Sequence, residues 1–109
     1  MKHAPQWIAT AALAVATLGA HTAAQANERE AGRKLFMSGT APSCAVCHTL
    51  RDAGATGEVG PVLDELKPDE ARVLQAMRNG LGVMPPFRDK LSEKDLALLA
   101  RYVAQVAGR

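Results

Sequence analysis

Residues 44 to 48 read Cys44-Ala45-Val46-Cys47-His48 (CAVCH), two cysteines three positions apart with a histidine directly after the second. One helical turn would bring both thiols to the same side of the chain, where each could form a thioether with one of the two vinyl groups on one edge of a haem. His48 would then lie under the iron and offer an imidazole nitrogen as the proximal ligand. The spacing is the signature of c-type haem attachment. It predicts one haem c per chain, covalently attached through Cys44 and Cys47.

Three other uses of these residues compete with haem. A disulfide across so short a loop would contribute little stability, because it removes little chain entropy. A thioredoxin-like redox pair sits where a strand meets a helix, and no strand-like pattern precedes Cys44. A structural zinc ion needs four ligands, and only Cys44, Cys47 and His48 remain if the N-terminus, with His3 and His21, is removed. Haem attachment is therefore the favoured interpretation.

The N-terminus has the pattern of a secretory signal peptide. A basic start is followed by an uncharged apolar run over residues 7–19 and by Ala24-Gln25-Ala26, which matches the AxA site of signal peptidase. We expect residues 1–26 to be cleaved, leaving a single haem-binding domain over residues 27–109 in the periplasm. An uncleaved anchor is the alternative. The run is shorter than the roughly 20 residues that span a bilayer, so no membrane anchor is expected.

The charge balance excludes one class of partner. Cleavage would remove Lys2 and leave twelve basic side chains against eleven acidic ones. No run or stripe of Lys and Arg resembles the footprint that phosphate binding needs. Nucleic acid is therefore not an expected partner.

Helical patterns dominate the remainder of the chain, and the segments between them read as loop. The expected helices are residues 27–38 with Asn27 as N-cap and Glu30 closing a capping box, residues 67–79 with Pro68 in the first turn, and a last helix that follows the N-cap Ser92 and carries Leu96, Leu99, Val103 and Val106 at helical spacing. No segment shows strand-like alternation, and the glycine-rich residues 49–60 read as loop. We therefore expect an all-α fold, a small helical bundle with long loops.

A methionine is the leading candidate for the second axial ligand of the iron, because the predicted mature chain has no second histidine. Met37 is too near the attachment site to reach the far face, and Met77 lies on the apolar side of a predicted helix, where core packing is the default. Met84 stands in the proline-rich strap of residues 81–90. Pro85 favours an extended backbone before it, so the strap could hold the thioether stiffly. The alternative is that Met84 only fills space beside the haem.

With these features the sequence resembles the class I c-type cytochromes, small mono-haem electron carriers. The segment Gly60-Pro61-Val62-Leu63 is similar to the family's GPxL motif, and Met84-Pro85 to its methionine-proline strap. The resemblance implies a cytochrome c-like bundle wrapped around the haem. It also implies that the Pro61 carbonyl accepts a hydrogen bond from His48 and that Leu63 packs on the haem.

The resemblance extends to the terminal helices. It implies that Gly32 and Phe36 on the first helix cross the last helix at Leu99 and Tyr102. A glycine within a helix costs about 1 kcal/mol relative to alanine. A close backbone crossing would explain Gly32, with simple tolerance of a surface glycine as the alternative.

A narrower resemblance concerns the partner. Residues 52–68 (DAGATGEVGPVLDELKP) and 78–87 (RNGLGVMPPF) are similar to small periplasmic cytochromes that serve bacterial sulfite dehydrogenases. It implies a molybdenum-containing catalytic subunit as electron donor and a terminal oxidase or second cytochrome as acceptor. We expect a single-electron carrier and not an enzyme. The alternative is a haem-based sensor or peroxidase-like enzyme with an open or labile sixth iron site.

Overall fold

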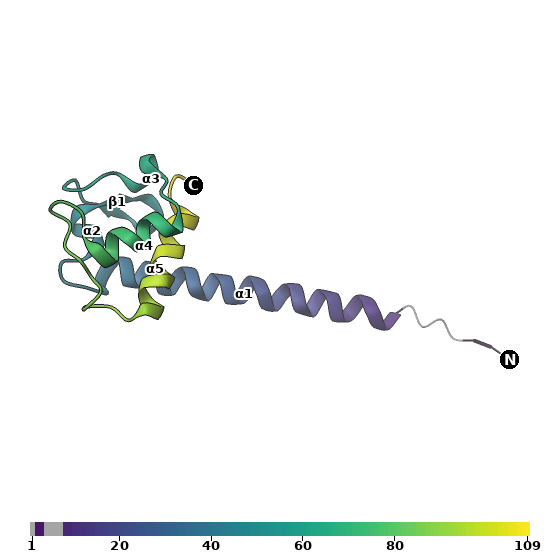
Figure 1. Cartoon of the computed structure of the whole chain (residues 1–109). Coiled ribbons are helices and arrows are strands. Elements are labelled where there is room, and N and C mark those ends of the chain that lie inside the picture. The colour runs from purple at the N-terminus through teal and green to yellow at the C-terminus, as the bar shows by residue number, and fades with distance from the viewer. Residues whose placement is uncertain (1, 4–7) are drawn as a thin grey trace.

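The computed structural model describes residues 2–3 and 8–109, with the backbone alone over residues 8–18, as a helical body at one end of a long N-terminal helix (Figure 1). The elements in chain order are α1 (Ile8–Ser38), α2 (Cys44–Cys47), β1 (Thr49–Leu50), η1 (Arg51–Ala53), β2 (Ala55–Thr56), α3 (Leu63–Leu66), α4 (Glu70–Asn79) and α5 (Glu93–Val106). Helices dominate, which confirms the predicted all-α class.

The first helix is much longer than predicted. Helix α1 begins at Ile8 and continues without a break through the predicted start at Asn27, so the expected N-cap at Asn27 and its capping box with Glu30 are wrong. Residues 8–26 are rich in alanine, the strongest helix former, so no free amides arise at residue 27. The helix points away from the body until Glu28, whose carboxylate lies 3.5 Å from Arg101 Nε (Figure 1). Within the described residues, no helix is long and apolar enough to cross a membrane.

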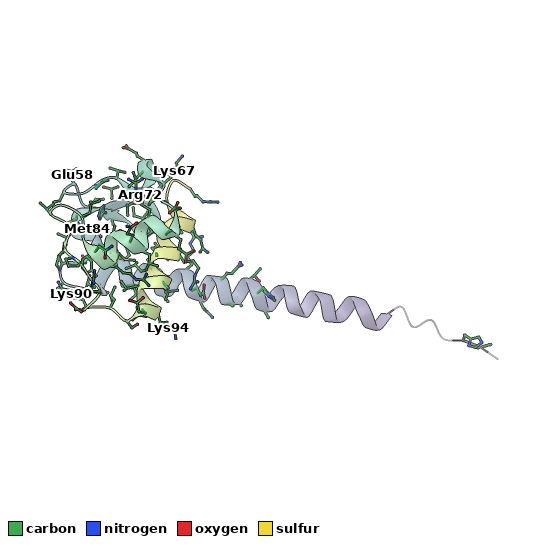
Figure 2. All side chains as sticks on the ribbon, viewed as in Figure 1. Glu58, Lys67, Arg72, Met84, Lys90 and Lys94 are labelled. Carbon is green, nitrogen blue, oxygen red and sulfur yellow. The ribbon has the colours of Figure 1, made fainter. Side chains whose placement is uncertain are left out.

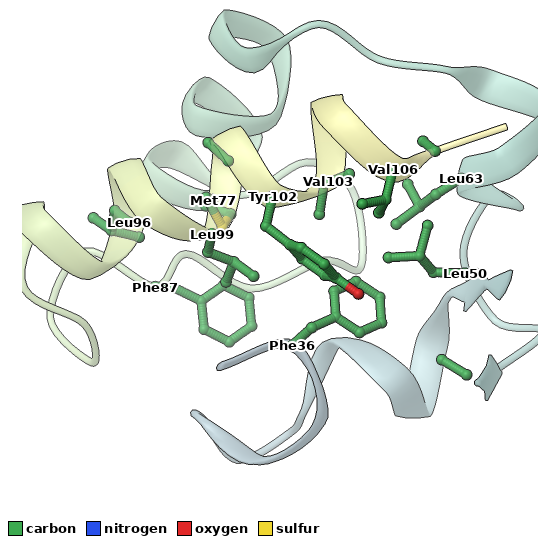
Figure 3. Packing of buried hydrophobic residues seen from close by; sticks show 13 residues of the cluster. Phe36, Leu50, Leu63, Met77, Phe87, Leu96, Leu99, Tyr102, Val103 and Val106 are labelled. Carbon is green, nitrogen blue, oxygen red and sulfur yellow. The ribbon is translucent and has the colours of Figure 1, made fainter. Parts of the chain in front are cut away.

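Helices α1 and α5 cross where Gly32 meets Tyr102. A Cβ placed on Gly32 would lie 2.4 Å from Cβ of Tyr102, closer than two carbon atoms can approach. Phe36, one turn further on, packs edge-to-face on the Tyr102 ring with centroids 6.4 Å apart (Figure 3). The predicted close crossing is confirmed, and it accounts for a glycine inside this helix.

Helices α4 and α5 both begin at a side-chain cap. Ser92 Oγ accepts a hydrogen bond from the Asp95 N–H at 3.1 Å, as the sequence predicted. The carboxylate of Asp69 accepts from the Arg72 N–H at 2.8 Å. Pro68 therefore lies before the cap and outside α4, which corrects the prediction that it belongs to the first turn. Lys67 precedes it in a left-handed conformation with φ of 46°.

The segment predicted as loop, residues 49–60, contains a small hairpin. Strands β1 and β2 pair antiparallel, with Thr49 opposite Thr56 and Leu50 opposite Ala55. The turn between them, η1, ends at Gly54 with φ of 70°. Two residues per strand are too few to show alternation in a sequence. The prediction of a structureless loop is wrong here, although the overall class is unchanged.

Asp52 ties this hairpin to both terminal helices. Its carboxylate accepts hydrogen bonds from Tyr102 Oη of α5 at 2.7 Å and from Arg33 of α1 at 3.1 Å, and it also pairs with Arg29. Burial alone would raise the pKa of Asp52, but the hydrogen bonds from Arg29, Tyr102 and Arg33 outweigh it and hold this pKa below its usual range. The ionised carboxylate thus fixes the segment that follows His48 against the α1–α5 crossing.

The apolar core lies between α5, α4 and the end of α1 that joins the body (Figure 3). Its largest fully buried side chains are Tyr102, Phe36, Leu50, Leu96 and Leu99. The four residues predicted for the buried face of the last helix, Leu96, Leu99, Val103 and Val106, are all buried. Helices cover the core on one side, and on the opposite side core residues line a cavity.

Candidate cofactor site

One cavity of about 640 Å³ opens between the core and the segments that carry the sequence motifs. It is lined by side chains from α1, α2, α3, α4, α5 and the strap. All six residues that the sequence singled out lie on its wall: Cys44, Cys47, His48, Pro61, Leu63 and Met84. Residues up to 40 positions apart in the chain thus meet at one place.

Helix α2 presents the two cysteines. It is a single turn over Cys44–Cys47, closed by a hydrogen bond from the His48 N–H to the Cys44 carbonyl at 2.9 Å. Both thiols are free and partly buried. Burial raises the pKa of the Cys44 thiol to about 11, whereas thiols of redox-active CxxC pairs have pKa values of roughly 3.5–7.5. This environment disfavours a thiol oxidoreductase.

His48 is oriented by the Pro61 carbonyl. Its Nδ1 lies 2.8 Å from Pro61 O, and because a carbonyl can only accept, Nδ1 carries the proton. Nε2 then keeps its lone pair free for a metal. Gly60 makes room for the ring, since a Cβ there would lie 2.5 Å from His48 Cε1. The Gly60 N–H also donates to the Cys47 carbonyl at 2.7 Å, which fastens this segment to α2.

The strap holds Met84 in a tight turn. The backbones of Leu81 and Met84 bond reciprocally, each N–H donating to the other residue's carbonyl at 3.0 Å. Gly80, with φ of 71°, starts the turn, and a Cβ on it would lie 2.8 Å from Met84 O. Phe87 closes the strap by donating its N–H to the Met77 carbonyl at 2.6 Å. Met84 is half-buried on the cavity wall (Figure 2), and its backbone has little freedom.

Met37 and Met77, the other two methionines considered as ligands, occupy the positions expected of them. Met37 is 40% exposed and does not line the cavity. Met77 is 3% exposed within the core cluster, although its side chain also reaches the cavity wall.

The cavity has the character that a haem requires. Its wall is mainly aliphatic and aromatic, as in Leu63, Phe87, Leu99 and Val103, and suits a flat apolar macrocycle. Two thiols, one imidazole with a free nitrogen and the thioether of Met84 would supply the groups for attachment and axial ligation. Among the residues that the structure describes, no three side chains of His, Cys, Asp or Glu gather as a metal site, which disfavours structural zinc. The residues fit haem c.

Some wall residues were not recognised from the sequence. Arg72 and Gln75 of α4 line the cavity, as do the exposed Val59, Leu81 and Val83, which are 68%, 73% and 89% exposed. The spacing of Arg72 and Gln75 did indicate that they share a helix face, because they are three positions apart. Only the apolar face of this helix, formed by Val73, Leu74 and Met77, was recognised from the sequence.

The comparisons with known proteins agree with this geometry. A family described as "Cytochrome C oxidase, cbb3-type, subunit III" matches residues 27–103. The chain is 32% identical over 97 residues to "Cytochrome c6" of Picosynechococcus sp., a match that covers 79% of this chain and 80% of the relative. It is 48% identical to the crystal structure of the c-type cytochrome SorU from Sinorhizobium meliloti, with a TM-score of 0.72, covering 76% of this chain and 94% of that one.

Proposed function

We infer that the chain, which belongs to the c-type cytochrome family that matches residues 27–103, carries single electrons on one haem. We assign His48 and Met84 as the residues that would hold the haem iron. The family implies covalently bound haem c and a role in electron transfer. Haem c, when bound, supplies a one-electron iron centre. One observation carries the axial assignment: His48 with a free Nε2, Met84 and the two thiols of α2 share one cavity wall.

The proposed ligands also explain why a carrier is favoured over an enzyme. A thioether is a soft donor, so histidine-methionine ligation raises the reduction potential relative to two nitrogen donors. The apolar wall disfavours the extra positive charge of the ferric state and acts in the same direction. If His48 and Met84 both held the iron, no coordination site would be left open for oxygen or substrate.

Export to the periplasm is part of the proposal. Its support is the signal-peptide pattern of residues 1–26, together with the contacts of α1, which reach the body from Glu28 onward. Removal of residues 1–26 would leave those contacts in place. N-terminal sequencing of the exported protein should read Asn27 first, and a retained N-terminus would contradict cleavage.

We further propose a molybdenum-containing sulfite dehydrogenase as the electron donor, with a terminal oxidase or second cytochrome as acceptor. The support is the resemblance of residues 52–68 and 78–87 to cytochromes that serve such enzymes. These segments form much of the cavity wall, including Pro61, Leu63 and Met84. The 48% identity to the c-type cytochrome SorU is consistent with this narrower likeness.

The axial assignment is tested by Met84→Ala. Haem should remain attached through Cys44 and Cys47, while the loss of the thioether should lower the reduction potential and let carbon monoxide bind the reduced protein rapidly. Met37→Ala is the matched control, because Met37 lies off the cavity; its spectrum and potential should equal those of the parent. The measurements are the haem absorption spectrum, a redox titration and carbon monoxide binding.

Two outcomes would contradict the assignment. An unchanged spectrum and potential in Met84→Ala would mean that Met84 only packs beside the haem. Rapid, tight carbon monoxide binding by the parent protein at neutral pH would mean that its sixth site is open or labile, as in a haem sensor or peroxidase-like enzyme.

A further inference from the structure

The wall of the cavity is apolar except at five positions, and only one of the five side chains is permanently charged. Its polar side chains are Ser43, His48, Arg72, Gln75 and Asn79. No Asp or Glu of the described chain lines it, and among the lining residues Arg72 carries the only permanent positive charge. A haem brings two carboxylates on the porphyrin edge opposite its two vinyl groups. A site for haem therefore has to accommodate two negative charges.

Three of the five polar side chains are poor candidates for binding the haem carboxylates, because of their partners or their position. His48 bonds to Pro61 through Nδ1. Ser43 directly precedes Cys44, so it lies at the edge where the vinyl groups would be attached. The side-chain oxygen of Asn79 accepts a hydrogen bond from Arg88 Nη2 at 2.7 Å, and Arg88 Nε donates to the Arg78 carbonyl at 2.8 Å, so Asn79 belongs to the base of the strap. Arg72 and Gln75 remain.

Among the residues from 19 onward, no hydrogen bond or ion pair holds the guanidinium of Arg72, whose backbone N–H donates to Asp69. Arg51 and Arg109 share this lack of a side-chain partner, but neither of them lines the cavity. By contrast, the guanidinium groups of Arg29 and Arg33 pair with Asp52, and that of Arg78 pairs with Glu93. A guanidinium presents a planar set of donors that matches a carboxylate. Arg72 thus has an unused carboxylate-binding group on the wall of a cofactor cavity.

The solvent exposure of Arg72 and Gln75 also favours this part of the cavity as the place for a carboxylate. Arg72 and Gln75 are both exposed residues that nevertheless line the cavity, so they lie at its rim. Arg72, labelled in Figure 2, lies in the first turn of α4. A carboxylate stays near water because burial of an unpaired charge is costly. Of the other exposed wall residues, Val59, Leu66, Leu81 and Val83 are apolar and offer such a group no side-chain donor, and Asn79 is held by Arg88.

We infer that Arg72 binds a haem propionate at the rim of the cavity, with Gln75 one turn along α4 as a second donor, and so positions the haem with its carboxylate edge toward the start of α4. This inference rests on the proposed haem site. Arg72 is a positioning residue that also tunes the iron. Its positive charge compensates a propionate near the haem, and without it the uncompensated negative charge favours the ferric state.

The test is a comparison of holoproteins that carry Arg72→Gln, Arg72→Lys and Lys67→Gln. Lys67 is a nearby exposed cation that does not line the cavity, so Lys67→Gln removes one charge outside the site. We expect Arg72→Gln to lower the reduction potential more than Lys67→Gln does, and Arg72→Lys to restore most of the loss. The resonance-Raman bending mode of the propionates, which follows their hydrogen bonding, should shift in Arg72→Gln and stay unchanged in Lys67→Gln.

The outcomes separate this inference from the proposed function. A parent protein without covalent haem in a pyridine haemochrome spectrum would end the proposed function itself. A parent with haem, in which Arg72→Gln leaves the Raman band unchanged or lowers the potential no more than Lys67→Gln, would overturn the role of Arg72 alone. If Arg72→Gln does not take up haem, the Raman band of Arg72→Lys decides: a band identical to that of the parent overturns the inference, and a shifted one supports it.

Discussion

Asp64 is a buried carboxylate that joins two distant parts of the chain. It is 8% exposed, and its oxygens accept hydrogen bonds from the Arg51 N–H at 2.8 Å and the Gly108 N–H at 3.0 Å. Burial alone would raise its pKa, but the hydrogen bonds from Gly108 and Arg51 outweigh it and hold the pKa below the ordinary 3.8. The residue next to it, Leu63, lies on the cavity wall, so this anchor also holds part of the site.

The pKa of Asp64 predicts how stability changes with acid. Because the pKa is lower in the folded state, its contribution is fully present above the ordinary value of 3.8 and is lost as the pH falls through the folded pKa. Asp64→Asn should leave a buried N–H without its acceptor and cost about 1–3 kcal/mol at neutral pH. It should also make the loss of stability below pH 4 shallower. The measurement is urea unfolding from neutral to acid pH.

Asp89→Asn is the control for this prediction, because Asp89 is an exposed residue of the strap. It should have the stability of the parent at neutral pH. If Asp64→Asn showed the same acid dependence as the parent, the carboxylate of Asp64 would not be the group that titrates.

The sequence identified the site residues that lie close together in the chain. It missed Arg72, which reaches the site only through the packing of distant elements. The positions of Cys44, Cys47 and His48 follow from one helical turn, so spacing alone brought them together. Arg72 has no such motif. Its place on the cavity wall depends on how α4 lies against α5, and tertiary packing is not visible in spacing.

The crossing of α1 and α5 gives the prediction that belongs to the scale of elements. In Gly32→Ala, the new Cβ would lie 2.4 Å from Cβ and 2.6 Å from Cγ of Tyr102, atoms that rotation of the side chain cannot move far. Overpacking costs about 1–3 kcal/mol, whereas alanine gains at most about 1 kcal/mol of helix propensity. The variant should therefore be less stable than the parent in urea unfolding.

Lys34→Ala is the matched substitution on the exposed side of the same helix, and its stability should change little. A Gly32→Ala variant as stable as the parent would mean that the two helices separate at no cost, and that the glycine is only a tolerated surface residue.

The elements that the sequence predicted well are those with their own caps and periodicity. The last helix has both, in Ser92 and in four buried positions, and it was placed correctly. The start of α1 was misplaced because Asn27 is a good cap residue that happens to lie inside an alanine-rich helix. The β1–β2 hairpin was missed because two-residue strands depend on tertiary contacts, such as those of Asp52, more than on β propensity.

For the whole molecule, the stability of the fold depends on what fills the cavity. If nothing filled it, the space of about 640 Å³ would leave the apolar side chains of its wall in contact with water, and the stabilisation that their burial supplies would be lost. The few aromatic side chains of the chain cannot fill such a space. A haem is therefore part of the core as well as the redox centre, and the fold and the function depend on the same group.

We predict that the exposed apolar rim of the cavity is the face by which the whole molecule meets its redox partner. Val83 is 89% exposed and Leu81 73% exposed, and both lie on the strap beside Met84. Val83→Glu would place a charge that must lose its water when the partner docks. A loss of about 1.4 kcal/mol would lower the rate at limiting concentration roughly tenfold, while the haem spectrum stays unchanged. The rate with a small-molecule reductant corrects for any fall in reduction potential that the added charge causes.

The measurement is reduction of the cytochrome by sulfite and a molybdenum-containing sulfite dehydrogenase, with a small-molecule reductant for comparison. Gln105→Glu adds the same charge on an exposed position of α5 that does not line the cavity, so it should react like the parent with both reductants. Equal rates for Val83→Glu and Gln105→Glu would mean that docking uses another face. A parent protein that the small reductant reduces and the enzyme with sulfite does not would remove the proposed donor and leave the electron carrier in place.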